Sequence, residues 1–166
     1  MPSLYEITVP VFARALQNLD HILVKAAASG IDEPSLMEAQ LAPDMLPFPR
    51  QVQIACDTAK LAVTRIAQAE PRPMPDEEKS LAELRERIAK TVGYLKEAEP
   101  AAFEGREGAE IVLKYPNFER RFTGLSLITE FTLPNFFFHV TTAYDLLRMK
   151  GVALGKMDYL AGAQAQ

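Results

Sequence analysis

The fold of this chain is decided by residues 133–148, which read LPNFFFHVTTAYDLLR. At 100° per residue, Asn135, His139, Thr142 and Leu146 fall on one stripe of a predicted helix. Phenylalanine, valine, alanine and leucine side chains surround that stripe, so three polar groups lie on the most apolar helix of the chain. Because burying a polar group is costly unless it is paired, this stripe is the first candidate for a functional site.

The overall composition is that of a globular domain. The chain has 166 residues, of which 48% are hydrophobic and 24% charged, and its net charge is −4. This length fits one domain, residues 1–166, with a sizeable core. The negative charge and the lack of a basic stripe with interleaved aromatic residues predict no nucleic-acid partner. The adjacent Arg120 and Arg121 are interpreted as the solvated edge of a hairpin.

The single cysteine, Cys56, excludes an internal disulfide and fits a reducing compartment. It lies among alanines and valines on an apolar helical face, so we interpret it as a small buried hydrophobe and not as a reactive thiol. Residues 1–6 show no secretory signal pattern, and each apolar stretch is interrupted before it could span a bilayer. The predicted location is the cytoplasm, with no membrane partner.

Four stretches have helical periodicity, at about residues 3–29, 49–68, 76–98 and from 124 to just before Gly151. Pro10 either sits in the first turn of the first helix or kinks it, and Pro134 interrupts or bends the last helix. A single helical turn is predicted for residues 35–39. Ser80 and Glu83 have capping-box spacing, so the third helix starts either there or just after Asp76. The proline-rich residues 70–75 are interpreted as a linker inside the domain.

Between residues 110 and 123 the hydrophobic period changes to alternation, and Pro116 and Asn117 offer a turn. This pattern predicts a short β-hairpin before the last helix. Residues 154–166 are predicted to form an extended arm with a frayed end.

Two pairs of apolar residues lie outside the predicted core and are expected to pack against another helix or a second subunit. Ile54 and Leu61 lie one heptad apart on nearly the opposite side of the second helix, where a second subunit is one possible cover. Phe137 and Tyr144 lie on the side of the last helix away from His139. We expect them to face another helix or a second subunit.

The remaining polar residues of the helices are interpreted as solvated. His21 shares a polar side of the first helix with Arg14 and Lys25 and is predicted to be a surface residue. The charges of the third helix, from Glu83 through Lys90, are interpreted as its outer face.

Several phrases of the sequence resemble an uncharacterised bacterial family within the DinB/YfiT-like superfamily, over about residues 4–159. They are Val9-Pro10-Val11-Phe12, Leu41-Ala42-Pro43-Asp44-Met45, Arg50-Gln51-Val52-Gln53-Ile54-Ala55, Leu133-Pro134-Asn135-Phe136 and His139-Val140-Thr141-Thr142-Ala143-Tyr144-Asp145. The resemblance implies an all-α fold, a four-helix bundle with a short β-hairpin before the last helix. It also implies frequent assembly as a homodimer.

Members of this superfamily typically hold a divalent metal with three histidines, one on the second helix and two spaced by four on the last. Carried over by position, His139 matches the second of the spaced pair and Asn135 takes the place of the first. The second-helix place falls at or near Gln53, and Asp57 lies one turn further on. Amide oxygens are weak ligands for zinc or nickel. No metal or other cofactor is therefore expected, with zinc or nickel as the alternative.

Amides pair well with each other and with imidazole. We therefore hypothesise a closed network of Gln53, Asn135 and His139, in a polar pocket that also includes Asp57 and Thr142. Two functions remain open, and no catalytic residue is assigned. The incomplete metal triad favours a metal-free bundle whose pocket accepts a small molecule or water. The alternative, implied by the resemblance, is a divalent-metal-dependent transferase or isomerase acting on low-molecular-weight thiols.

Overall fold

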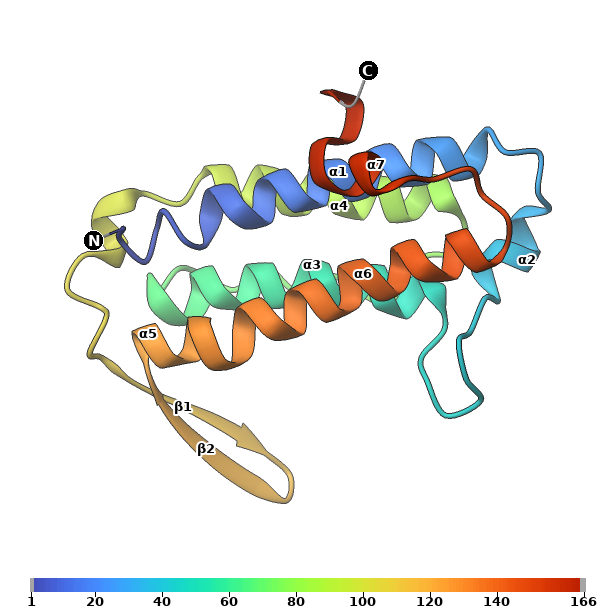
Figure 1. The fold of residues 1–166 in the computed structure, drawn as a ribbon. Coiled ribbons are helices and arrows are strands. Elements are labelled where there is room, and N and C mark those ends of the chain that lie inside the picture. Colours follow the sequence, from blue (N-terminus) through green and yellow to red (C-terminus); the bar gives the residue numbers. More distant parts are fainter. Residues whose placement is uncertain (1, 165–166) are drawn as a thin grey trace.

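The computed structural model of the chain describes residues 2–164, except for the side chains of Tyr115 and Phe118. Four long helices lie side by side in it: α1 (Val9–Ala27), α3 (Phe48–Ile66), α4 (Leu81–Lys96) and α6 (Leu133–Met149). Helices α1 and α4 form one layer and α3 and α6 the other (Figure 1). Each helix packs against two neighbours, in the cyclic order α1, α4, α3, α6.

The core lies where the apolar stripes of the four helices meet. In α1 the apolar residues recur at spacings of three and four, and they are fully buried. The rings of Phe12 in α1 and Phe136 in α6 are 0% exposed, and their centroids lie 4.7 Å apart. The four-helix architecture is therefore the one that the sequence predicts.

Two helix ends differ from the prediction, and the structure decides between the two predicted starts of a third helix. Helix α1 begins at Val9 and not near residue 3, and Pro10 occupies its first turn, where a missing N–H costs nothing. Helix α4 begins at Leu81, because the Ser80 hydroxyl accepts a hydrogen bond from the Glu83 N–H at 3.2 Å and caps the helix. Helix α3 ends at Ile66, just before Gln68 adopts a φ of +54°.

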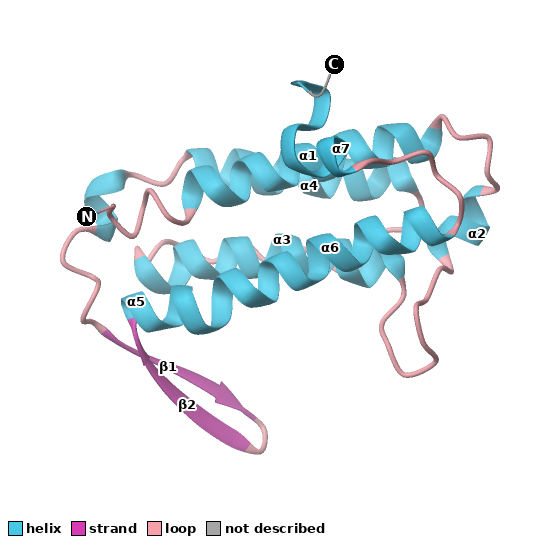
Figure 2. Cartoon of the chain, in the orientation of Figure 1, coloured by secondary structure: helices cyan, strands magenta, loops and turns pink. Residues whose placement is uncertain are grey.

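The predicted hairpin and helical turn are present, the turn two residues earlier than expected, and one short 3-10 turn was not predicted. Helix α2 (Glu33–Met37) begins where the Asp32 carboxylate accepts a hydrogen bond from the Ser35 N–H. A 3-10 turn, η1 (Pro100–Phe103), precedes the hairpin of β1 (Glu110–Tyr115) and β2 (Phe118–Thr123). Figure 2 shows this hairpin projecting from the helical body.

The hairpin register leaves Pro116 and Asn117 as its two-residue turn, as predicted. Arg121 is exposed and donates hydrogen bonds to the Glu110 carboxylate at 2.9 Å and to the Glu119 carboxylate at 2.7 Å. The interpretation of Arg121 as a solvated hairpin edge is confirmed.

The last long helix is a single run of three segments. The first is α5 (Gly124–Ser126), the second is the π-helical η2 (Leu127–Thr132), and α6 follows. Pro134 occupies the first turn of α6. Because a π segment inserts an extra residue into the helical ladder, the predicted interruption lies just before the proline and not at it.

The prediction of an extended C-terminal arm is wrong over the described residues. Helix α7 (Lys156–Ala161) and a 3-10 turn, η3 (Gly162–Gln164), pack on α1. Figure 1 shows the red α7 lying along the blue α1. Residues 165–166 of the predicted arm lie outside the described residues.

A buried carboxylate fastens α7 to α1. Asp158 is 9% exposed, and the Lys25 ammonium donates to both of its oxygens at 2.9 Å. His21 Nε2 lies 3.2 Å from the same carboxylate, so His21 is half-buried in this contact and not a free surface residue. Burial raises the pKa of Asp158, but hydrogen bonds from the Gly155 N–H, Lys25 and His21 outweigh it, and the pKa is lowered overall.

Phe137 is expected to contribute to this fold. Its half-buried ring packs edge-on against Phe136, with centroids 5.1 Å apart, and belongs to the shell around the core. A Phe137→Asp substitution removes apolar contact and places a carboxylate there. We expect the free energy of unfolding to fall by about 2–4 kcal/mol, measured by urea denaturation. The neighbouring Phe138 is 54% exposed, so Phe138→Asp is the matched control. Equal losses in the two variants would contradict the assignment.

Candidate functional site

His139 lies on the side of α6 that faces α3, and it is 8% exposed. Its Nδ1 lies 2.7 Å from the Gln51 side-chain oxygen. The Gln51 amide nitrogen donates to the Leu46 carbonyl oxygen at 2.8 Å, which turns the Gln51 oxygen toward the imidazole. A carbonyl oxygen only accepts hydrogen bonds. Nδ1 of His139 therefore carries the proton, and the lone pair of the neutral ring lies on Nε2.

The surroundings of His139 favour its neutral form. Burial lowers its pKa, and the positive charge of Arg50 lowers the pKa further. Within residues 2–164 no group hydrogen-bonds Nε2. The exposed ring of Phe138 stands edge-on to the imidazole, with centroids 5.1 Å apart. The result is one available acceptor nitrogen on a nearly buried ring.

The other polar residues of the α6 stripe are satisfied separately. The Asn135 amide donates to the Thr58 hydroxyl of α3 at 2.9 Å. The Thr142 hydroxyl donates to the Phe138 carbonyl of its own helix at 2.7 Å. The seam between α3 and α6 therefore holds two cross-helix hydrogen bonds, one at His139 and one at Asn135.

Gln53 does not join His139 and Asn135. Its oxygen accepts from the Arg50 guanidinium at 2.8 Å, and its nitrogen donates to the Glu78 carboxylate at 2.8 Å. The contacts therefore differ from the single network that the sequence predicts. Gln51 and Gln53 flank the buried Val52, and 100° per residue puts them on opposite flanks of α3. Gln51 faces α6, whereas Gln53 faces residues 70–79.

Residues 70–79, here called the strap, are fixed to α3 and α4 by a charge cluster around the buried Arg87. Arg87 of α4 is 2% exposed, and its guanidinium lies 2.9 Å from Asp57, 3.0 Å from Asp76 and 2.9 Å from Glu78. It also donates to the Pro75 carbonyl oxygen at 3.0 Å. Asp57 thus belongs to this cluster and not to the surroundings of His139.

The interpretation of residues 83–90 as a solvated face is wrong for Arg87. A signal was present: Leu84, Arg87 and Thr91 recur at spacings of three and four, and all three are buried. Burial raises the pKa of Glu78, but hydrogen bonds from Arg87, from its own backbone and from Gln53 outweigh it, so the pKa is lowered overall. The Glu78 carboxylate is therefore ionised near neutral pH.

The donors at these two places fit a transition metal poorly. Within residues 2–164, no group of three or more His, Cys, Asp or Glu residues is positioned to hold a metal ion. Burial raises the pKa of the Cys56 thiol to about 12, so it stays protonated, as expected of a buried hydrophobe. The Asp57 carboxylate contacts Arg87 and also Lys60, at 3.0 Å. Nε2 of His139 is left as the one imidazole nitrogen here that could bind a metal ion strongly.

The predicted second apolar strip is partly exposed. Leu61 is 40% exposed and Ile54 is half-buried on α3. The homodimer that would cover this strip stays a prediction.

Stability should depend on His139 in a defined pH window. The pKa of the folded-state imidazole is lowered, so the unfolded chain takes up a proton first as the pH falls below about 6.5. The protein therefore loses stability in this window, and a His139→Gln variant lacks that loss. Urea denaturation at about pH 7.5 and about pH 5 measures it. The same pH dependence in both proteins would contradict a neutral, buried His139.

Comparisons with known proteins agree with this architecture. The sequence model of a family described as "Domain of unknown function (DUF1993)" matches residues 4–160. A crystal structure of a DinB family member protein from Shewanella denitrificans is similar to this chain, with 41% sequence identity and a TM-score of 0.86. The similarity covers 95% of this chain and 92% of that one. No curated protein matches the chain. Within the described part of the chain, every helix is too short or too polar to traverse a bilayer.

Proposed function

Because the chain belongs to the DUF1993 family and has a DinB-like fold, we propose that it is a helical-bundle binding protein that works without a bound transition metal. Its site is the seam between α3 and α6 at His139. The ligand is a small molecule, or a water, that donates a hydrogen bond to His139 Nε2.

The donor set of the seam carries this proposal. Zinc and nickel sites in proteins need about three or four protein ligands drawn from imidazole, thiolate and carboxylate groups. The Asn135 amide is engaged with Thr58, and the Gln53 amide is engaged with Arg50 and Glu78. His139 Nε2 is then the one imidazole nitrogen that the seam offers. One imidazole nitrogen is enough to accept a hydrogen bond from a bound molecule. One protein ligand alone binds a metal ion only weakly.

One observation favours the metal-dependent alternative. Histidines that bind metals usually donate their other ring N–H to an oxygen, which fixes the tautomer. The contact between His139 Nδ1 and the Gln51 oxygen has this form. An enzyme that activates a thiol on a divalent metal is therefore the second candidate. The further metal ligands would then come from groups other than the described residues of this chain.

Metal analysis separates the two candidates. The protein is prepared without chelators or an affinity tag, dialysed against zinc or nickel, and measured by elemental analysis and equilibrium dialysis. We expect well below one ion per chain, and the same value in His139→Gln. The control is His21→Gln, which removes the other histidine of the chain. One ion per chain that is lost in His139→Gln and retained in His21→Gln would overturn the proposal.

A further inference from the structure

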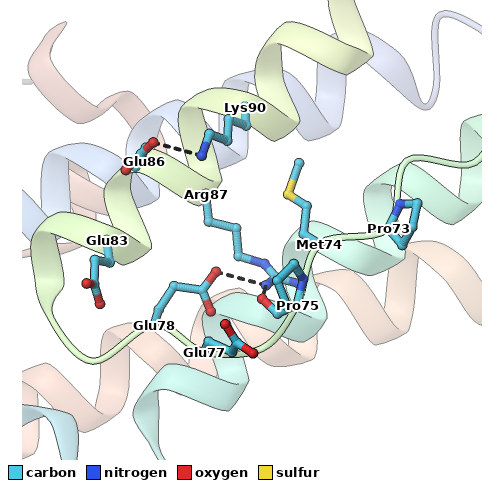
Figure 3. Close-up of a pocket in the computed structure, with 9 residues that line it drawn as sticks. All are labelled: Pro73, Met74, Pro75, Glu77, Glu78, Glu83, Glu86, Arg87 and Lys90. Carbon is cyan, nitrogen blue, oxygen red and sulfur yellow. Dashed lines mark hydrogen bonds and ion pairs between the residues drawn. The ribbon is translucent and has the colours of Figure 1, made fainter.

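A second candidate site lies away from His139, between the strap and α4. It is a cleft of about 510 Å³, with Pro73, Met74 and Pro75 on the strap side and Arg87 on the α4 side (Figure 3). The prolines and the methionine offer aliphatic surface. Four glutamates and two cations also line the cleft, which leaves it negatively charged.

Among the described residues that line this cleft, Arg87 has one buried polar atom without a partner. The two terminal nitrogens of the Arg87 guanidinium donate to carboxylates and to the Pro75 carbonyl oxygen. Its Nε is buried and hydrogen-bonds nothing among the described residues. Figure 3 shows the Arg87 side chain extending from α4 toward the strap, beside Met74 and Glu78. A buried N–H without an acceptor is rare and destabilising, so an oxygen atom of a bound molecule would be favoured as its hydrogen-bond acceptor.

The charges around the cleft indicate which charge a ligand there would carry. Glu78 is engaged with Arg87, and Glu86 pairs with Lys90 at 2.7 Å. Glu77 is exposed and adds a further negative charge at the rim. This excess of carboxylates favours a cation.

We propose that this cleft binds a small aliphatic amine that also carries a hydroxyl or carbonyl oxygen. The ammonium group lies at the rim near Glu77, and the aliphatic chain lies against the prolines. The oxygen accepts the hydrogen bond of Arg87 Nε. Met74 lies beside the Arg87 side chain (Figure 3), and its sulfur lies 4.0 Å from the Thr91 hydroxyl. Its unbranched side chain swings aside easily to admit the oxygen.

The test follows the Arg87 Nε–H resonance in proton–nitrogen correlation spectra of the full chain. The probes are a terminal aminopentanol and pentylamine, which differ by one hydroxyl. We expect a saturable shift of the Arg87 Nε–H signal with the aminopentanol. Pentylamine should bind about fivefold more weakly and should not move this signal, because it lacks the accepting oxygen. Arg85 is the internal control, because its Nε already donates to Asp20 at 2.7 Å.

Variants test the charge at the rim. Glu77→Gln should weaken aminopentanol binding about threefold, as expected for one exposed charge. Glu99→Gln, which changes an exposed glutamate outside the cleft lining, should leave binding unchanged. The proposal is overturned by the absence of a saturable shift at Arg87, by equal shifts at Arg85, or by equal affinities for the two probes. These outcomes are independent of metal binding at His139.

Discussion

Replacing Arg87 with methionine is expected to lower the free energy of unfolding by about 3–5 kcal/mol. Methionine keeps much of the aliphatic volume but removes the cation that Asp57, Asp76 and Glu78 share. The remaining carboxylates then repel each other next to the core, and the Pro75 carbonyl oxygen loses its donor. Urea denaturation followed by circular dichroism measures the loss.

The matched control for this variant is Arg85→Met on the same helix. Arg85 pairs with Asp20 at 2.7 Å, but its side chain is 42% exposed, so the expected loss is within about 1 kcal/mol. The effect of Arg87→Met should also depend on pH. Because the pKa of Glu78 is lowered in the folded protein, its ionisation stabilises the fold at every pH above its pKa in the unfolded chain. This stabilisation is lost as the pH falls through the pKa of Glu78 in the folded protein. The gap between parent and variant should therefore narrow below about pH 4. A gap that stays constant would contradict the assigned cluster.

Hydrophobic spacing predicted the helices because the spacing of apolar residues along a helix is a local property of the sequence. The stripe of α1 follows from spacings of three and four, and the alternation at residues 110–115 gives the first strand of the hairpin. Helix ends depend on single hydrogen bonds. The Ser80 cap was one of two possible starts for α4, and only the structure decides between them.

The partners of polar residues could not be predicted in the same way. Gln51 and Gln53 flank Val52, and their distances from His139 depend on how α3 turns toward α6. The sequence pattern has no information on that rotation. The contact between Lys25 and Asp158 joins residues 133 positions apart, so local spacing gives no sign that the C-terminal segment folds back on α1.

Arg87 is an instructive intermediate case. Its position on the stripe of Leu84 and Thr91 indicated burial, yet a charged residue next to Glu86 and Lys90 is more often solvated. The carboxylates that neutralise it come from α3 and from the strap. Since those partners are distant in the sequence, the burial of Arg87 follows only from the assembled bundle.

Replacing Gly124 with alanine is expected to cost about 3 kcal/mol of unfolding free energy. Gly124 begins α5, directly after the hairpin. A Cβ at this position would lie 2.1 Å from the Arg106 carbonyl oxygen, which is too close for any side chain. The backbone is held there by the hydrogen bond from the Leu125 N–H to the Glu107 carbonyl oxygen at 2.9 Å. The hairpin would have to move away from α5, and its protection against hydrogen exchange should fall.

Gly93→Ala provides the opposite expectation in the same protein. Gly93 lies inside α4, and a Cβ there would have nothing within 4 Å. Alanine lowers the conformational entropy of the unfolded chain, so this variant should gain about 0.5–1 kcal/mol. Thermal and urea denaturation of both variants measure the difference. If Gly124→Ala melts like the parent, the close approach of residues 106 and 124 is not part of the native fold, and the hairpin is anchored elsewhere.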